Sequence, residues 1–276
     1  MLGNLLKYEM KASARTLLPL YIGTLAVALV CGIQIVMLIS SEAGTVVDSF
    51  FTSNSVIPVF TFLLFFALCV AIVVLTAMII IQRFNKNLIG DEGYLMFTLP
   101  VSHVQLLTSK LTAGLLWVIV GTVVMILAGI IICVPAAFIA AADQVDWAYF
   151  WNEVQYLFSM WNPFASIGLW IVDVVLTIVA TILTVYISIM IGQTEQFDKH
   201  RVAVSVVAFF LINWLFTFVY TNLLYLLSYS TTSIMDATAF TSVINGMLGI
   251  DIVMTLIQCA ICFAGTIWFM KKKLNL

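Results

Sequence analysis

The chain has 276 residues, of which 63% are hydrophobic and only 9% are charged. A soluble domain carries about 25% charged residues, and a chain of this size still needs a polar surface in water. Together with a mean hydropathy of +1.17, this composition excludes a water-soluble enzyme, a nucleic-acid-binding protein and a disordered regulator. We therefore expect lipid to surround most of the chain.

Six apolar stretches without lysine or arginine are each at least 23 residues long. About 20 helical residues cross a hydrocarbon core of about 30 Å. The sequence therefore predicts an all-α integral membrane protein with six transmembrane helices in a single domain over residues 1–276. The predicted spans cover about 17–39, 56–81, 111–134, 164–192, 202–227 and 247–270.

All the basic residues lie on one side of the predicted spans. All 11 lysines and arginines lie before the first span, after the last, or in the loops that join spans two to three and four to five. The loops of the other face carry acidic residues only: Glu42, Asp48, Asp143, Asp146, Glu153 and Asp236. Because positive charge marks the cytoplasmic side, we expect both termini to be cytoplasmic.

Residues 2–16 are amphipathic at the helical period. Their basic residues lie on one stripe and their apolar residues on another: Lys7, Lys11 and Arg15 against Leu2, Leu5, Leu6 and Met10. This pattern predicts a helix lying in the cytoplasmic interface of the membrane before the chain turns into the bilayer at Pro19. A frayed basic tail is the alternative.

The loop after the second span combines acids with aromatic residues. Asp91 and Glu92 precede Tyr94 and Phe97, and acids favour the start of a helix through its dipole. Aromatic side chains supply burial at protein interfaces. The loop therefore predicts a short cytoplasmic helix that docks on a partner, with contact to lipid headgroups as the alternative.

The segment 135–163 on the outer side contains an aromatic stripe at helical spacing. Its members are Trp147, Phe150, Trp151, Val154, Phe158 and Trp161. Such a stripe predicts a helix that anchors at headgroup depth. A lid over a substrate exit is the second interpretation, and the sequence leaves the two open.

Polar residues inside the predicted spans mark a candidate pathway or a site between helices. They are Asp173, Thr177, Thr181, Asn213, Thr217 and Gln258. For the threonines, helix packing is the alternative, because hydroxyls often hold membrane helices together. An intramembrane carboxylate such as Asp173 is harder to explain by packing, although its state of charge is open.

The sequence offers no catalytic motif and no metal-ligand cluster. Its five cysteines all lie in apolar stretches, and the Cys259–Cys262 pair has no histidine or carboxylate at metal-ligand spacing. A nucleotide-binding P-loop is also missing from the sequence. We therefore expect no enzymatic activity and no cofactor bound by this chain, so any ATP must bind to another protein.

At the loop after the second span, the chain resembles the ABC-2 type permease subunits of bacterial ABC exporters. The matching residues are Gly93-Tyr94-Leu95, Thr98-Leu99-Pro100-Val101-Ser102, Leu106-Leu107 and Ser109-Lys110. The resemblance implies that a separate ATPase binds ATP and Mg and docks on this loop. It assigns the coupling to Asp91, Glu92, Gly93, Tyr94, Phe97 and Pro100.

The resemblance further implies a second permease chain, identical or homologous, in a bacterial cytoplasmic membrane. The expected cargo is hydrophobic or amphipathic: an antimicrobial peptide, a lipid-like molecule or a drug. Two alternatives come from other classes. One is an ion-coupled secondary transporter with Asp173 as its proton site, and the other is a membrane sensor or immunity protein that transports nothing.

Overall fold

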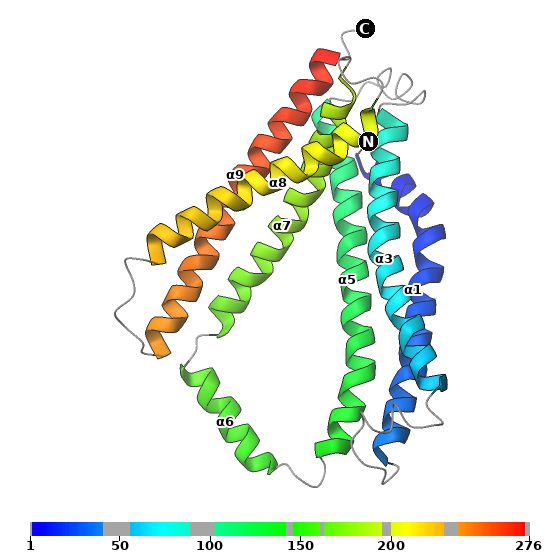
Figure 1. Ribbon diagram of the computed structural model, residues 1–276, viewed down its shortest axis with the longest axis vertical. Coiled ribbons are helices and arrows are strands. Elements are labelled where there is room, and N and C mark those ends of the chain that lie inside the picture. The colour runs from blue at the N-terminus through cyan, green and yellow to red at the C-terminus, as the bar shows by residue number, and fades with distance from the viewer. Residues whose placement is uncertain are drawn as a thin grey trace. The chain divides into compact units, whose positions relative to one another are not determined.

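The computed structural model describes residues 2–40, 56–88, 103–141, 146–160, 163–194, 200–228 and 237–273. These residues form seven helices and contain no strand. Six of the helices are long and apolar enough to cross a membrane. The predicted class, a helical multi-pass membrane protein, is thus confirmed. The helices are α1 (Leu2–Ser40), α3 (Val56–Leu88), α5 (His103–Ala141), α6 (Trp147–Met160), α7 (Pro163–Gly192), α8 (Arg201–Ser228) and α9 (Ala237–Lys273) (Figure 1).

Several helices extend well beyond the predicted spans. α5 has 39 residues, about 58 Å at 1.5 Å per residue, whereas the hydrocarbon core is about 30 Å thick. It begins at His103 and continues past Pro135 to Ala141, although its predicted span ended at residue 134. Hydropathy therefore located the apolar part of this helix and missed both of its ends.

The expected turn of the chain at Pro19 is wrong. Residues 2–16 are helical, but α1 continues through Pro19 without interruption. A proline removes one backbone hydrogen bond and strains the preceding turn. Leu17 and Tyr21 flank the proline and are both buried in the same core, so packing holds the helix on either side of it.

The chain divides into two compact units. The first comprises residues 1–82 and 112–150, and the second comprises residues 83–111 and 151–276. The borders therefore fall inside α3, α5 and α6. In the described residues, the second unit contains α7, α8 and α9 together with most of α6, one end of α3 and the beginning of α5.

The core of the first unit is apolar and joins α1, α3 and α5. It contains Leu17, Tyr21, Ile72, Trp117 and Val124. The Tyr21 hydroxyl donates a hydrogen bond to the backbone oxygen of Trp117 at 3.3 Å, and the two rings lie 6.2 Å apart. A second cluster, formed by Ala28, Cys31, Ala128 and Ile132, continues the contact between α1 and α5. Small residues in that cluster let the helices approach closely, as is common in membranes.

In the second unit, α7 packs against both α8 and α9. Near its beginning, the Ser166 hydroxyl donates to Asn245 Oδ1 on α9 at 2.9 Å. At its other end, Gly192 meets the start of α8 so closely that a Cβ atom would lie 2.5 Å from the backbone oxygen of Arg201. Only glycine fits this approach without a shift of the backbone.

Candidate functional site

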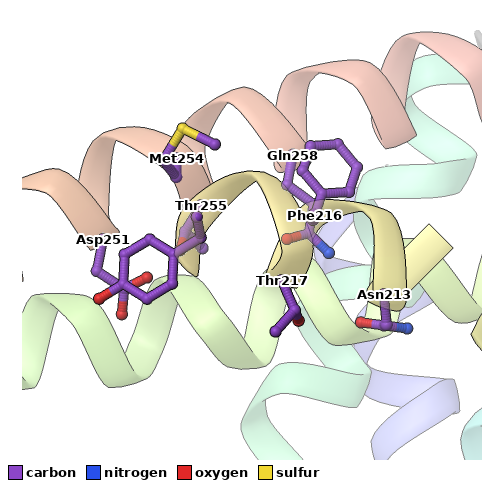
Figure 2. Close-up of a pocket in the computed structure, with 8 residues that line it drawn as sticks. Asn213, Phe216, Thr217, Asp251, Met254, Thr255 and Gln258 are labelled. Atoms are coloured by element: carbon purple, nitrogen blue, oxygen red, sulfur yellow. The ribbon is translucent and has the colours of Figure 1, made fainter. Parts of the chain in front are cut away.

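A half-open polar cavity of about 90 Å³ lies between α8 and α9. Six of its eight lining residues carry polar side-chain groups, and Figure 2 shows how residues from the two helices surround it. Six of the lining residues fall in the middle third of the candidate spans Arg201–Leu226 and Val243–Lys271, and Tyr220 and Asp251 lie just outside it. The lining residues are Asn213, Phe216, Thr217, Tyr220, Asp251, Met254, Thr255 and Gln258.

Helical periodicity brings these residues together. On α8, the lining positions 213, 216, 217 and 220 recur at three or four residues, and on α9 the positions 251, 254, 255 and 258 do the same. Residues at this spacing lie on one face of a helix. Each helix therefore presents one mixed polar and aromatic or thioether face to the cavity.

Three residues that the sequence predicted as pathway residues line this cavity: Asn213, Thr217 and Gln258. Asn213 Nδ2 donates to the backbone oxygen of Phe209 on its own helix at 2.9 Å. This bond leaves the amide oxygen Oδ1 as an acceptor. The cavity thus offers acceptor groups at a depth where lipid offers none.

Asp173 lies on α7 and does not line the cavity. One of its carboxylate oxygens, Oδ1, is buried and accepts no hydrogen bond within the described residues. The carboxylate of Asp173 interacts electrostatically with that of Asp251 on α9. Two carboxylates from different helices therefore lie near one another inside the spans.

The structure does not bring Thr177 and Thr181 into the cavity. Both side chains are exposed, and the Thr181 hydroxyl donates to the backbone oxygen of Thr177 at 2.8 Å. Further along the same helix, Thr184 and Ser188 are buried and bond to their own helix in the same manner. The polar line along α7 thus consists mainly of hydroxyls that are satisfied locally.

The sequence reasoning missed Asp251, Tyr220 and Thr255. Asp251 lies inside a predicted span and precedes Gln258 by seven residues, which places the two on one helical face. Like Asp173, Asp251 is an acidic residue in an apolar stretch, and such residues commonly mark functional sites in membrane proteins. Tyr220 follows Asn213 by seven residues, so the same spacing would have found it.

The predicted coupling residues Asp91, Glu92, Gly93, Tyr94, Phe97 and Pro100 lie outside the described residues. The helix ends on either side of them are described. Phe84, at the end of α3, is fully buried and stacks on Tyr186 of α7 with ring centroids 4.1 Å apart. At the start of α5, the resembling residues Leu106, Leu107, Ser109 and Lys110 are all buried.

The part of the aromatic stripe from Trp147 to Phe158 lies on a helix, α6. α6 begins after Asp146, whose Oδ1 accepts hydrogen bonds from the backbone nitrogens of Ala148 and Tyr149 at 3.0 and 3.3 Å. This is the capping expected at a helix start. Trp147 and Trp151 remain exposed, and Trp161 lies outside the described residues.

Among the described residues, no group of three or more histidine, cysteine, aspartate or glutamate side chains is placed to hold a metal. The cysteines are free thiols, and Cys262 is almost fully buried. The site is therefore defined by its carboxylate, amide, hydroxyl and aromatic groups.

Fold and site together define a multi-pass helical membrane protein with a polar cavity inside its spans. No family model, no curated protein and no solved structure matches the chain. The basis for a functional proposal is therefore the sequence and structure of this chain.

Proposed function

We propose that the chain is the membrane-spanning permease subunit of an ATP-driven exporter of the ABC-2 type. The residues from Gly93 to Lys110 support this through their resemblance to such permeases. Six candidate spans and a polar cavity between two of them fit a transport function. The cargo would be hydrophobic or amphipathic, such as an antimicrobial peptide, a lipid-like molecule or a drug.

The burial of the helix ends beside residues 89–102 carries the proposal. Phe84 and Leu107 are both fully buried, and both belong to the compact unit that contains α7, α8 and α9. The Phe84 ring stacks directly on Tyr186 of α7, and α7 in turn packs against the two helices that enclose the cavity. Because close-packed side chains transmit displacements, a force on the loop would reach the cavity through α7.

Within this proposal, an ATPase that binds ATP and Mg docks on Tyr94 and Phe97. A second permease chain, identical or homologous, completes the pathway. The 11-to-none distribution of basic residues supports cytoplasmic termini and this loop on the cytoplasmic side. Residues 2–16 would lie at that interface as the first turns of α1, in a bacterial cytoplasmic membrane.

Co-purification tests the proposal directly. A tagged copy of the full chain is extracted from its native membrane in mild detergent, and the captured proteins are identified by mass spectrometry. We expect an ATPase with a P-loop, in a complex whose ATP hydrolysis is stimulated by lipid-like or cationic amphiphiles. Capture of the permease alone, under conditions that preserve a known exporter complex, would contradict the proposal.

An ion-coupled transporter is the second candidate, and the buried Asp173 Oδ1, which accepts no hydrogen bond from the residues that the structure describes, favours it. Such a carboxyl group can bind and release a proton during transport. Proteoliposomes that contain only this chain distinguish the two. Amphiphile export driven by a proton gradient without ATPase would support the ion-coupled transporter, whereas export that needs ATP and the co-purified ATPase would support the exporter.

A further inference from the structure

The cavity between α8 and α9 contains an acidic group without a basic partner. In α7, α8 and α9 the basic residues are confined to helix ends: Arg201 begins α8, and Lys271 to Lys273 end α9. Asp251 precedes Lys271 by 20 residues, about 30 Å along the helix. No ion pair joins Asp251 to another described residue. Since the described part of the chain places no basic side chain beside Asp251, a proton or a ligand is left to compensate its charge.

The volume of the cavity argues for a ligand. A protonated carboxyl group needs only one hydrogen-bond acceptor and no additional space. The cavity of about 90 Å³ is instead large enough to hold ordered water beside the carboxyl group. Such a space also fits a small polar group of a larger molecule.

The chemistry of the lining argues for an organic cation. An ammonium group has three hydrogen-bond donors and no acceptor. Asp251, the Asn213 amide oxygen and Gln258 together supply acceptors from two helices. A metal ion would call for a denser set of ligands, which the described residues lack.

Aromatic and apolar side chains complete the lining. Phe216 and Tyr220 are four residues apart on the same face of α8, and Met254 of α9 also lines the cavity. Aromatic rings attract cations through their faces. Phe216 and Met254 also supply apolar contacts for the carbon atoms next to an ammonium group.

We propose that this cavity binds the protonated amino group of an amphipathic amine, with Asp251 as its counter-ion and Asn213 and Gln258 as further acceptors. Asp173 on α7 adds negative charge nearby. The inference rests on the proposed function for the identity of the cargo, and it narrows that cargo to cationic amphiphiles. Binding itself requires no ATPase, so it can be tested separately.

The test measures binding to the full chain in phosphatidylcholine nanodiscs by equilibrium dialysis of radiolabelled octylammonium. Octanol is the matched neutral probe, and empty discs correct for partitioning into lipid. Wild-type discs should bind the amine saturably and should take up octanol no more than empty discs do. This comparison needs no variant and so does not depend on the folding of one.

Three variants locate the site. Asp251→Asn should weaken amine binding at least tenfold, and Gln258→Leu, which keeps the charge, should weaken it less. Glu153→Gln removes an exposed carboxylate on α6 and should bind the amine as the wild type does. Circular dichroism and gel filtration establish that each variant is folded.

Three results would overturn the inference: equal saturable binding of octanol, wild-type affinity in folded Asp251→Asn, or no saturable amine binding above that of empty discs. ATPase recovery is measured on the same proteins. If amine binding fails while the ATPase is still recovered, only the cargo assignment is wrong. If the amine binds but no ATPase is recovered with the chain, the exporter assignment is wrong and the binding site stands.

Discussion

The helices α1, α3 and α5 and the helices α7, α8 and α9 use polar residues in different ways. In the first group, polar side chains pair across helices: Tyr21 donates to the backbone of Trp117, and the Thr61 hydroxyl donates to Gln34 Oε1. In the second group, Ser166 also pairs with Asn245 across helices, but eight residues of α8 and α9 line a polar cavity. Among the described residues, buried side-chain atoms without a hydrogen-bond partner occur in both groups, at Thr76 and Trp117 in the first and at Asp173 in the second, so the cavity is what distinguishes the second group.

This difference separates a packing function from a binding function. A polar pair between helices satisfies itself and fixes one arrangement. A carboxylate or amide beside a cavity keeps its hydrogen-bonding capacity for another molecule, at a cost in stability. We therefore expect mutations in the first group to affect folding and mutations in the second to affect transport.

The largest expected effect is on stability, in the core of the first unit. Trp117 is 6% exposed and packs with Leu17, Tyr21 and Ile72. Trp117→Ala should lower the free energy of unfolding by about 3 kcal/mol, the lower end of the range for a buried aromatic side chain. We expect the lower end because lipid can cover part of the apolar surface that the truncation exposes. Thermal unfolding in nanodiscs measures this. Trp214→Ala is the control, since Trp214 is 63% exposed on α8; equal destabilisation by both changes would remove the distinction between core and surface.

The next effect concerns the proposed ATPase contact beside the second unit. The double change Tyr94→Ala and Phe97→Ala should weaken ATPase binding by about 2 kcal/mol or more, as for a truncated hot spot. That is more than a tenfold loss of affinity, visible as reduced ATPase recovery in pull-down from a permease that remains folded and inserted. The matched control replaces two exposed aromatics of α6, Trp147 and Trp151, and should leave recovery intact. Normal ATPase recovery in the Tyr94→Ala and Phe97→Ala double variant would show that this loop is not the coupling element.

Sequence alone predicted the spans best where charge or proline bounds them. The predicted span 164–192 differs from α7 by one residue at its start, and the span 202–227 differs from α8 by one residue at each end. The span 111–134 was far too short for α5, because hydropathy detects the apolar stretch and is blind to a helix that continues beyond it. The turn predicted at Pro19 is absent because Leu17 and Tyr21 pack into one core and hold the helix on both sides of the proline. This packing is not visible in the sequence.

The candidate site was predictable only in part. Spacing placed Asn213 and Thr217 on one face of a helix, and both line the cavity. Spacing also grouped Thr177 and Thr181 with Asp173, but it could not reveal that the Thr181 hydroxyl bonds to its own helix. The helices α8 and α9 face each other because both pack on α7. This tertiary arrangement cannot be predicted from the spacing of residues within one helix.

A smaller effect is expected at Asp173. In Asp173→Asn, the loss of charge near Asp251 should reduce ATP-driven export of an amine probe about tenfold in proteoliposomes with the co-purified ATPase. A tenfold change corresponds to about 1.4 kcal/mol. Folding should be unaffected or improved, because a neutral amide costs less in lipid than a carboxylate. Thr181→Val should export normally, since its hydroxyl serves only its own helix. Wild-type export by Asp173→Leu would exclude a transport function for this carboxylate.

The smallest expected effect distinguishes the two units by how each accommodates one methyl group. A Cβ atom at Gly32 would lie 2.8 Å from the backbone oxygen of Ile131, whereas one at Gly265 would lie 2.6 Å from Cδ1 of Ile187. The backbone oxygen is fixed by the α1–α5 contact, but the end of an isoleucine side chain can rotate away. Gly32→Ala should therefore lower the free energy of unfolding by about 1 kcal/mol through overpacking. Gly265→Ala should be nearly neutral, because alanine favours helix over glycine by about 0.5–1 kcal/mol and offsets the cost of moving Ile187. Unfolding of both variants in the same nanodiscs measures the difference, and a larger loss at Gly265 would mean that α7 and α9 pack as rigidly as α1 and α5.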